Sequence, residues 1–141
     1  MGEVKQKENV KIKVLVVRPG ERPFETEIDR NLESMQELVG GYIEQVCPFN
    51  DDVSLICNEE GKIYGLTPNR ALRTEEGEIF DVIAGTFFIA YSPSDTENFE
   101  SLPDDLSKKN TEYFKYPECI VFKDGKIIAL KMYAEEESNA S

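Results

Sequence analysis

NLESMQELVGGYIEQVCPFNDDVSLICNEEGKIYGLTPNR, residues 31–70, carries the helix and turn signals from which the rest of the architecture follows. Apolar residues at helical spacing predict a short helix at its start. These residues are Leu32, Met35, Leu38 and Val39. The helix is expected to end at Gly40, because glycine enters the left-handed backbone region at low cost. Two apolar-rich runs, 42–46 and 53–57, follow and predict antiparallel strands joined by a tight loop.

The end of the second strand predicts a turn. Asn58 and Gly61 occupy the first and fourth positions of NEEG, which suits a type I turn that closes another hairpin onto a short strand at 62–64. Residues 67–70 then predict a turn or a single helical turn. The whole stretch predicts a helix followed by a meander, and it does not specify a chemical reaction.

A hairpin is predicted ahead of this stretch. Residues 11–17 alternate basic and apolar side chains and then become continuously apolar, which predicts a strand with one deeply buried portion. Residues 24–28 alternate with period two, which predicts a half-exposed partner strand with Glu25 and Glu27 on its outward face.

Three further elements are predicted downstream. Residues 79–83 and 86–91 flank a glycine, which favours either one bulged strand or two segments bent at that glycine. Residues 101–114 predict a helix with a serine cap. The Asp124-Gly125 pair predicts a two-residue type I′ hairpin over 118–133, which we expect to be an ordered part of the sheet.

These elements predict an α+β fold, a mostly antiparallel sheet of roughly six or seven strands with two packed helices, because the strands follow one another by short turns. A single domain is expected over residues 11–133, and 141 residues are enough to bury its core. Residues 1–10 are expected to form a disordered arm, and residues 134–141 a disordered acidic tail.

Four short motifs occur in order along the chain. They are VGGYIEQV at 39–46, CNEEGKIYGL at 57–66, PNR at 68–70 and DVIAGTFFI at 81–89. Together they resemble the uncharacterised domain-of-unknown-function family 3846 over roughly residues 11–114, so the hairpin at 118–133 lies outside the resemblance. The resemblance implies a small protein of Gram-positive bacteria, their plasmids or their phages. It implies no activity and no catalytic residues.

The net charge of −12 is unevenly distributed. Residues 24–118 carry seven basic and twenty-one acidic side chains, a net of −14, whereas residues 1–23 carry six basic and three acidic ones. An acidic body repels nucleic acid and anionic membrane surfaces and favours a basic partner, or it serves only solubility. We therefore expect no direct binding to nucleic acid or membrane.

The cysteine pattern predicts reduced thiols. Cys47, Cys57 and Cys119 give an odd count without a Cys-x-x-Cys motif. In the expected hairpin Cys57 lies opposite Ile43 or Glu44, about three residues (~10 Å) from Cys47 and beyond disulfide reach. Because the start of the sequence has no apolar signal-peptide core and no run approaches ~20 apolar residues, a cytoplasmic location in the host cell is expected.

Several kinds of active site are excluded by composition. Without histidine there is no Ser-His or Cys-His dyad and no imidazole metal ligand. There is no Walker loop or Gly-x-Gly-x-x-Gly, and Asn50-Asp51-Asp52 lacks the ligand ladder of a calcium loop. No catalytic residue, metal or cofactor is therefore expected.

The acidic turn and the glycine pair offer two candidate sites. Glu59 and Glu60, with Glu44 on the neighbouring strand, could supply paired carboxylates for acid–base chemistry, although a hairpin turn alone explains Asn58. Gly41 could let a ligand approach backbone donors beside Tyr42, or the glycines could simply end the helix.

Asn69 and Arg70 offer a third candidate. A guanidinium can hold phosphate or carboxylate in a bidentate manner, or it can pair with Glu44 or Glu59. The apolar run at 87–91 is a fourth, either an exposed strand that pairs with a partner or part of the core.

For function we expect a non-enzymatic binding protein of a phage or related mobile element. It would engage and inhibit a host protein with a basic surface, such as a defence or nucleic-acid-processing factor, through its acidic surface or a sheet edge. The alternative is a protein that binds a nucleotide-like anion. The residues expected to hold that anion are Arg70, Asn69, Asn58 and, by stacking, Tyr42. A third possibility is a hydrolase that uses Glu44 and Glu59.

Overall fold

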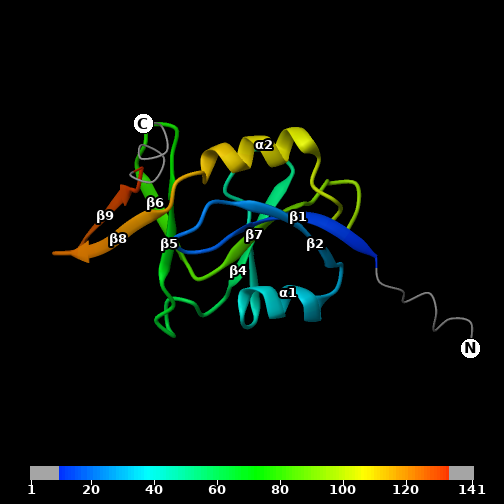
Figure 1. Cartoon of the computed structure of the whole chain (residues 1–141), viewed down its shortest axis with the longest axis horizontal. Helices are drawn as coiled ribbons and strands as arrows, with labels where there is room; N and C mark the ends of the chain where they lie inside the picture. Colours follow the sequence, from blue (N-terminus) through cyan, green and yellow to red (C-terminus); the bar gives the residue numbers. More distant parts are fainter. Residues whose placement is uncertain (1–9, 134–141) are drawn as a thin grey trace, which may run out of the picture.

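The chain adopts an α+β fold in a computed structural model that describes residues 10–133, and the predicted fold class is confirmed (Figure 1). The disorder expected for residues 1–10 and 134–141 falls, apart from Val10, outside the described residues. The described elements are β1 (Lys11–Val17), β2 (Phe24–Asp29), α1 (Leu32–Val39), β3 (Ile43–Val46), β4 (Val53–Asn58), β5 (Pro68–Arg73), β6 (Ile79–Ala84), β7 (Phe87–Tyr91), α2 (Asp104–Tyr113), β8 (Glu118–Lys123) and β9 (Lys126–Lys131). No helix among residues 10–133 is long and apolar enough to cross a membrane.

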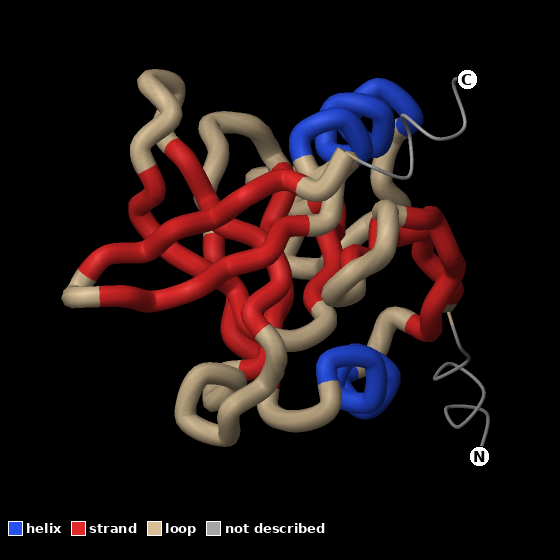
Figure 2. The backbone as a smooth tube through the Cα atoms, turned by 60° about the vertical axis from the view of Figure 1, so that its left-hand side comes forward, coloured by secondary structure: helices blue, strands red, loops and turns tan. Residues whose placement is uncertain are grey.

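The main sheet is antiparallel, with strand order β2-β1-β7-β4-β3. In the middle of the sheet Leu15 pairs with Glu25 of β2 on one side and with Ile89 of β7 on the other. The two helices cover opposite faces of this sheet (Figure 2). Because both faces are covered, the central strands are apolar at successive positions instead of alternating.

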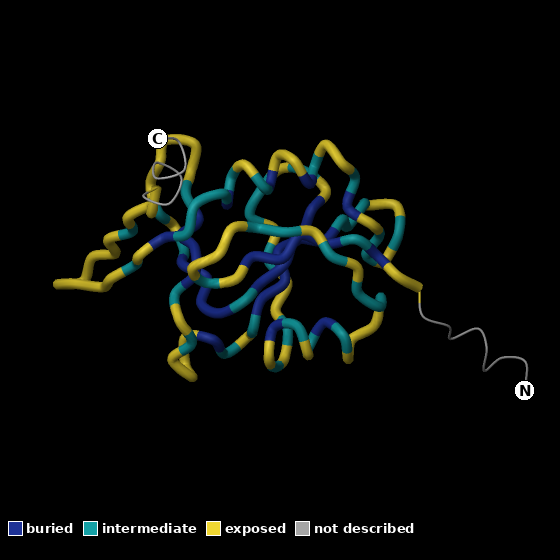
Figure 3. Tube along the Cα trace, in the orientation of Figure 1, coloured by how far each residue is buried: buried dark blue, intermediate teal, exposed yellow. Residues whose placement is uncertain are grey.

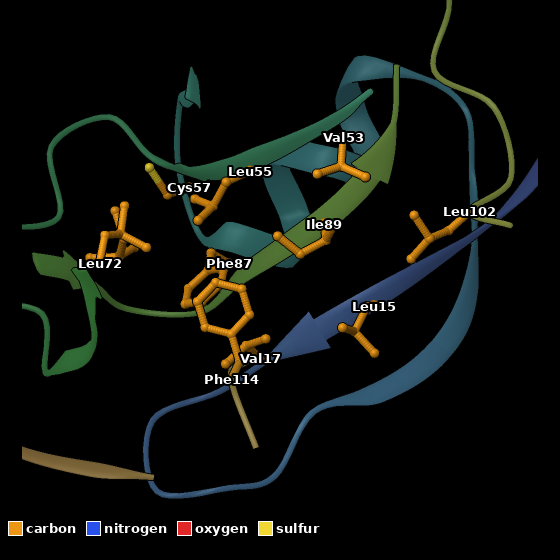
Figure 4. Packing of buried hydrophobic residues seen from close by; sticks show 11 residues of the cluster. Leu15, Val17, Val53, Leu55, Cys57, Leu72, Phe87, Ile89, Leu102 and Phe114 are labelled. Carbon is orange, nitrogen blue, oxygen red and sulfur yellow. The ribbon is translucent and has the colours of Figure 1, made fainter. Parts of the chain in front are cut away.

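Two hydrophobic clusters lie on the two faces of the sheet. The cluster on the α1 face takes the even positions of β1, Ile12, Val14 and Val16, together with Met35 and Val39 of the helix. The cluster on the α2 face takes the odd positions, and its side chains converge around Phe87 and Phe114 (Figure 4). It consists of Leu15, Val17, Val53, Leu55, Cys57, Leu72, Ile83, Phe87, Ile89, Leu102 and Phe114.

The helix ends show which local predictions were correct. Asn31 caps α1, its Oδ1 accepting from the Ser34 backbone N–H at 2.8 Å, and Gly40 ends the helix with φ of 82°. The predicted serine cap of α2 is wrong: the helix follows Pro103 without a side-chain cap. The Ser101 hydroxyl instead accepts a 2.9 Å hydrogen bond from the backbone N–H of Lys13 in β1.

The strand assignments differ from the prediction at two places. Residues 62–64 form turns, not a strand, and Leu66 N–H bonds back to the Gly61 carbonyl at 2.9 Å. Residues 67–70 were expected to turn, whereas Pro68 begins strand β5, which pairs with β6 in a separate two-stranded sheet. Gly85, with φ of 82°, bends the chain between β6 and β7, so the two-segment alternative is correct.

Strands β8 and β9 form the predicted hairpin, with Asp124 and Gly125 both at positive φ as a type I′ turn requires. The expectation that this hairpin joins the main sheet is wrong. It is a separate two-stranded sheet that projects from the body, and most of its residues are exposed (Figure 3). Its base contacts β5, where the Glu118 carboxylate accepts from Arg73 at 2.9 Å and from the Ala71 backbone N–H at 3.4 Å.

Candidate functional site

Six of the eight predicted site residues lie together, where α1, the β3–β4 hairpin and the loop after β4 meet. They are Gly41, Tyr42, Glu44, Asn58, Glu59 and Glu60. Two adjoining depressions share Asn58: one of about 300 Å³ that is lined by Glu44 and Glu59, and one of about 540 Å³ that is lined by Tyr42 and Glu60. This part of the predicted site is therefore one continuous region of the surface.

Asn58 and Gly41 hold this region in shape. The Asn58 Oδ1 accepts from the Glu60 backbone N–H at 2.8 Å, and its Nδ2 donates to the Val39 carbonyl in the last turn of α1 at 3.2 Å. A Cβ on Gly41 would lie 2.8 Å from that Nδ2, so glycine leaves room for the Asn58 side chain. The turn that this asparagine stabilises was predicted, but its bond to the helix was not.

The glycine pair does not offer free backbone donors to a ligand. The N–H groups of Gly40 and Gly41 both donate to the Gln36 carbonyl, at 2.8 and 3.1 Å. Two donors on one carbonyl complete the end of α1, which is the common role of a glycine there. The helix-end alternative therefore accounts for these residues.

The first depression places the two proposed acid–base residues on its rim. Glu44 lies opposite Cys57 in the strand register, and the backbone N–H of Glu59 donates to the Tyr42 carbonyl at 2.8 Å. Both glutamates are exposed, and neither carboxylate forms a hydrogen bond or ion pair with a described residue. They share the rim with Lys62, whose Nζ pairs with Asp81 at 2.8 Å. No described residue therefore orients either glutamate carboxylate as a catalytic group requires.

Cys57 lines the same depression but does not supply a nucleophile. Burial, with the charge of Glu44 as the next cause, raises the pKa of the Cys57 thiol to about 11. The thiolate is the reactive form of cysteine, so this sulfur stays protonated and inert near neutral pH. In residues 10–133 no group of three or more Cys, Asp or Glu side chains is placed to hold a metal ion.

The loop formed by residues 59–66 is anchored at two points. Gly61 is buried, and a Cβ there would lie 2.9 Å from the Ala84 carbonyl at the end of β6. Leu66 packs onto Gly85, where an added Cβ would lie 2.7 Å from its Cδ1. Each close approach places part of the loop against the junction of β6 and β7, and residues 62–65 between them lie exposed on the surface.

Three large apolar side chains project from this region. Tyr42 is 68 % exposed, Ile63 78 % and Tyr64 69 %. Carboxylates surround them along the two depressions; they belong to Glu33, Glu37, Glu44, Glu59 and Glu60. We call these eight residues the acidic aromatic surface. Of its members, Ile63, Tyr64, Glu33 and Glu37 were not predicted, although apolar residues inside the charged turn EEGKIYG were a usable signal.

Arg70 and Asn69 are not part of this surface, because both are completely buried. The Arg70 guanidinium donates to four acceptors: the Phe114 carbonyl at 3.0 and 3.1 Å, the Glu21 carbonyl at 2.6 Å, the Asn69 Oδ1 at 2.8 Å and the Asn69 carbonyl at 3.3 Å. The Asn69 amide in turn donates to backbone carbonyls, including that of Val17 at 2.9 Å. The expected anion site at these residues is not present, and neither is the alternative ion pair with Glu44 or Glu59.

The position of Arg70 has a structural reason. Phe114 caps the C-terminal end of α2, whose last turn contains no basic residue. A cation at that end interacts favourably with the helix dipole, and β5 supplies it from outside the helix. Burial lowers the Arg70 pKa to about 10, while the negative charge of Glu118 acts in the opposite direction, so the guanidinium remains charged near neutral pH.

The apolar run at 87–91 belongs to the core. It forms β7, which lies between β1 and β4 and is buried over its first four residues. Of the two alternatives for this run, the exposed partner-binding strand is therefore wrong. The edges of the main sheet are β2 and β3.

Comparison with known proteins gives one family match. The model of the family described as Domain of unknown function (DUF3846) matches residues 12–115, more than half of the chain. The match ends before β8, in agreement with the extent of the resemblance inferred from the four motifs. Comparison with curated proteins gives no match, and comparison with solved structures gives none either.

Proposed function

Because the chain belongs to the DUF3846 family, whose description carries no activity, we propose from its surface that it is a non-enzymatic binding protein. It binds a host protein with a basic surface and inhibits it, and it serves a phage or related mobile element in the cytoplasm of the host cell. The mobile-element setting rests on the family resemblance, and the mode of binding rests on the acidic aromatic surface.

The observation that carries this proposal is the exposure of Tyr42, just ahead of β3, and of Ile63 and Tyr64 on the anchored loop of residues 59–66. Protein interfaces depend on a few large side chains, with tyrosine enriched among them, that are enclosed by a polar rim. A loop whose backbone is anchored before binding loses less conformational entropy when a partner covers it. The surface therefore has the composition of a protein-binding site.

The charge of the surface selects the partner. Among the described residues that line the two depressions, Lys62 is the one basic residue, and its Nζ is already paired with Asp81. Such a rim speeds association with a basic protein and repels anions. The same rim opposes the nucleotide-like ligand that was considered as an alternative.

The test uses variants that keep the fold. Replacing Tyr42, Ile63 and Tyr64 together by serine removes the apolar centre, and their exposure means that the described core is untouched. Wild-type protein and this triple variant are used as baits in a lysate of a Gram-positive host, and the captured proteins are identified by mass spectrometry. A matched control replaces Val10 and Phe80, which are also exposed, by serine.

We expect a basic host protein that the wild type and the control capture and the triple variant does not. Its activity should fall when the wild type is added in stoichiometric amounts. Capture of the same proteins by the wild type and the triple variant would contradict the proposed surface. Capture without any loss of the captured protein's activity would contradict inhibition.

A further inference from the structure

The β8–β9 hairpin presents apolar side chains on both of its faces. Cross-strand pairs share a face, and successive residues alternate between faces. Val121 pairs with Ile128 on one face, and Phe122 pairs with Ile127 on the other. All four are at least 39 % exposed, and Leu130, on the Val121 face, is 62 % exposed.

The exposed apolar area of the hairpin is large for so small an element. Seven large apolar side chains from 121 to 133 are about half exposed, over both faces together. Those on the Val121 face, Val121, Ile128 and Leu130, present an apolar patch on the order of 300 Å². An isolated two-stranded hairpin is marginally stable in water. A partner surface that covers this face would therefore remove its apolar patch from water and stabilise the hairpin.

The charges on the hairpin indicate the chemistry of that cover. Lys123 and Lys126 pair across the strands at the tip, on the same face as Val121 and Ile128. Neither lysine forms an ion pair with a residue in the described part of the chain. Two such hairpins placed face to face would bring like charges together, which disfavours that arrangement. An apolar surface with carboxylates at its rim fits this face better.

The chain itself contains such a surface. A groove of about 910 Å³ lies between the turn that joins β5 to β6 and the C-terminal half of α2. Its apolar lining includes Phe49, Tyr113 and Phe80, and the Phe80 side chain is 52 % exposed. Phe49 and Tyr113 pack edge to face at 5.0 Å, which gives the groove a rigid floor.

The rim of the groove is acidic. Glu75, Glu76 and Glu112 are exposed along it, and none of their carboxylates pairs with a cation among residues 10–133. The basic residues of the lining are already engaged: Arg73 pairs with Glu118 at 2.9 Å, and Lys109 with Asp51 at 3.0 Å. The rim therefore retains negative charge that two lysines of a docked hairpin could neutralise.

We infer that the β8–β9 hairpin of one copy docks, through its Val121 face, into the acidic-rimmed groove of a second copy. The apolar side chains of that face cover Phe80 and its neighbours, while Lys123 and Lys126 meet Glu75 and Glu76. This contact uses a surface distinct from the acidic aromatic surface, so it neither requires nor excludes the proposed host partner.

The experiment measures self-association of the full chain by sedimentation equilibrium. One variant reverses the charge of the hairpin tip (Lys123→Glu with Lys126→Glu), a second reverses the rim (Glu75→Lys with Glu76→Lys), and a third combines them. The matched control, Phe122→Ser with Ile127→Ser, alters the opposite face of the hairpin. All these positions are exposed, and circular dichroism verifies that each variant is folded.

We expect the wild type to self-associate, and each charge reversal to weaken its association constant at least tenfold. The combined variant should recover most of that loss. The control should keep an association constant within about threefold of the wild type. A wild type that remains a single chain up to roughly millimolar concentration overturns the inference. So does a combined variant no better than the weaker of its parents, or a control as impaired as the tip variant.

Discussion

Replacing Arg70 by methionine should destabilise the protein strongly, because this side chain ties three segments together from a completely buried position. Its guanidinium donates to carbonyls of Phe114 at the end of α2 and of Glu21 in the β1–β2 loop, and to the Asn69 side chain. Methionine fills a similar volume but donates nothing, so these acceptors lose their donor.

The expected loss can be worked from these contacts. A buried acceptor left without a donor costs about 1–3 kcal/mol, and the Phe114 carbonyl alone accepts two of the bonds. Methionine carries no charge, so the variant is spared the cost of burying a cation, and this offsets part of the loss. We expect a net decrease of about 3 kcal/mol in the free energy of unfolding, which lowers the melting temperature of a domain of this size by roughly 10 °C.

The assay is guanidinium chloride unfolding followed by circular dichroism, with Arg18→Met as the control because Arg18 is exposed. The control should lose less than about 1 kcal/mol, since its guanidinium lies over the Phe24 ring at the surface. If Arg70→Met were as stable as Arg18→Met, and instead abolished an anion-induced rise in melting temperature, Arg70 would be a ligand site and the structural role would be refuted.

Two further predictions concern the thiols and the base of the hairpin. At pH 8 a thiol reagent should label the exposed Cys47 and Cys119 rapidly. It should label Cys57 only on unfolding, because burial raises the pKa of the Cys57 thiol to about 11. Rapid labelling of all three cysteines would contradict this prediction. Glu118→Gln should lower the free energy of unfolding by about 1–3 kcal/mol, because it removes the charged partner of Arg73. It should also speed hydrogen exchange in β8 and β9. Unchanged exchange would show that the Arg73–Glu118 pair does not hold the hairpin.

The sequence was informative wherever a structure depends on a few neighbouring residues. Asn31 and Gly40 set the two ends of α1 through their own side chain and backbone. Asp124-Gly125 specified its hairpin in the same way, because few residue pairs adopt two positive φ angles. Cys57 was predicted opposite Ile43 or Glu44 and lies opposite Glu44, so the tight loop between the two strands fixed the register to within one residue.

Features that depend on distant segments were missed. Residues 67–70 predicted a turn because proline and asparagine are typical turn residues, yet the end of α2 supplies the carbonyls that let Arg70 be buried in β5. Residues 62–64 were assigned to a strand for the opposite reason: their apolar side chains suit a sheet, but Gly61 is held against β6 and the loop turns away. No local pattern encodes either contact.

The candidate site was predicted in part, for the same physical reason. Tyr42, Glu44 and the turn that begins at Asn58 lie together because the β3–β4 hairpin brings their segments together, and the hairpin was predictable. Glu33 and Glu37 join them because the Asn58 amide binds the end of α1 at the Val39 carbonyl. That contact crosses between elements, so the α1 side of the surface emerged only with the structure.

The central claim is that the acidic aromatic surface binds a basic host protein, and the most direct measurement is the association rate with the captured protein as a function of salt. If its carboxylates steer binding, the rate should fall at least tenfold as the Debye length shrinks from ~10 Å to ~3 Å, and serine at Tyr42, Ile63 and Tyr64 should abolish the complex. A rate independent of salt, together with an intact complex for the triple variant, would contradict the claim.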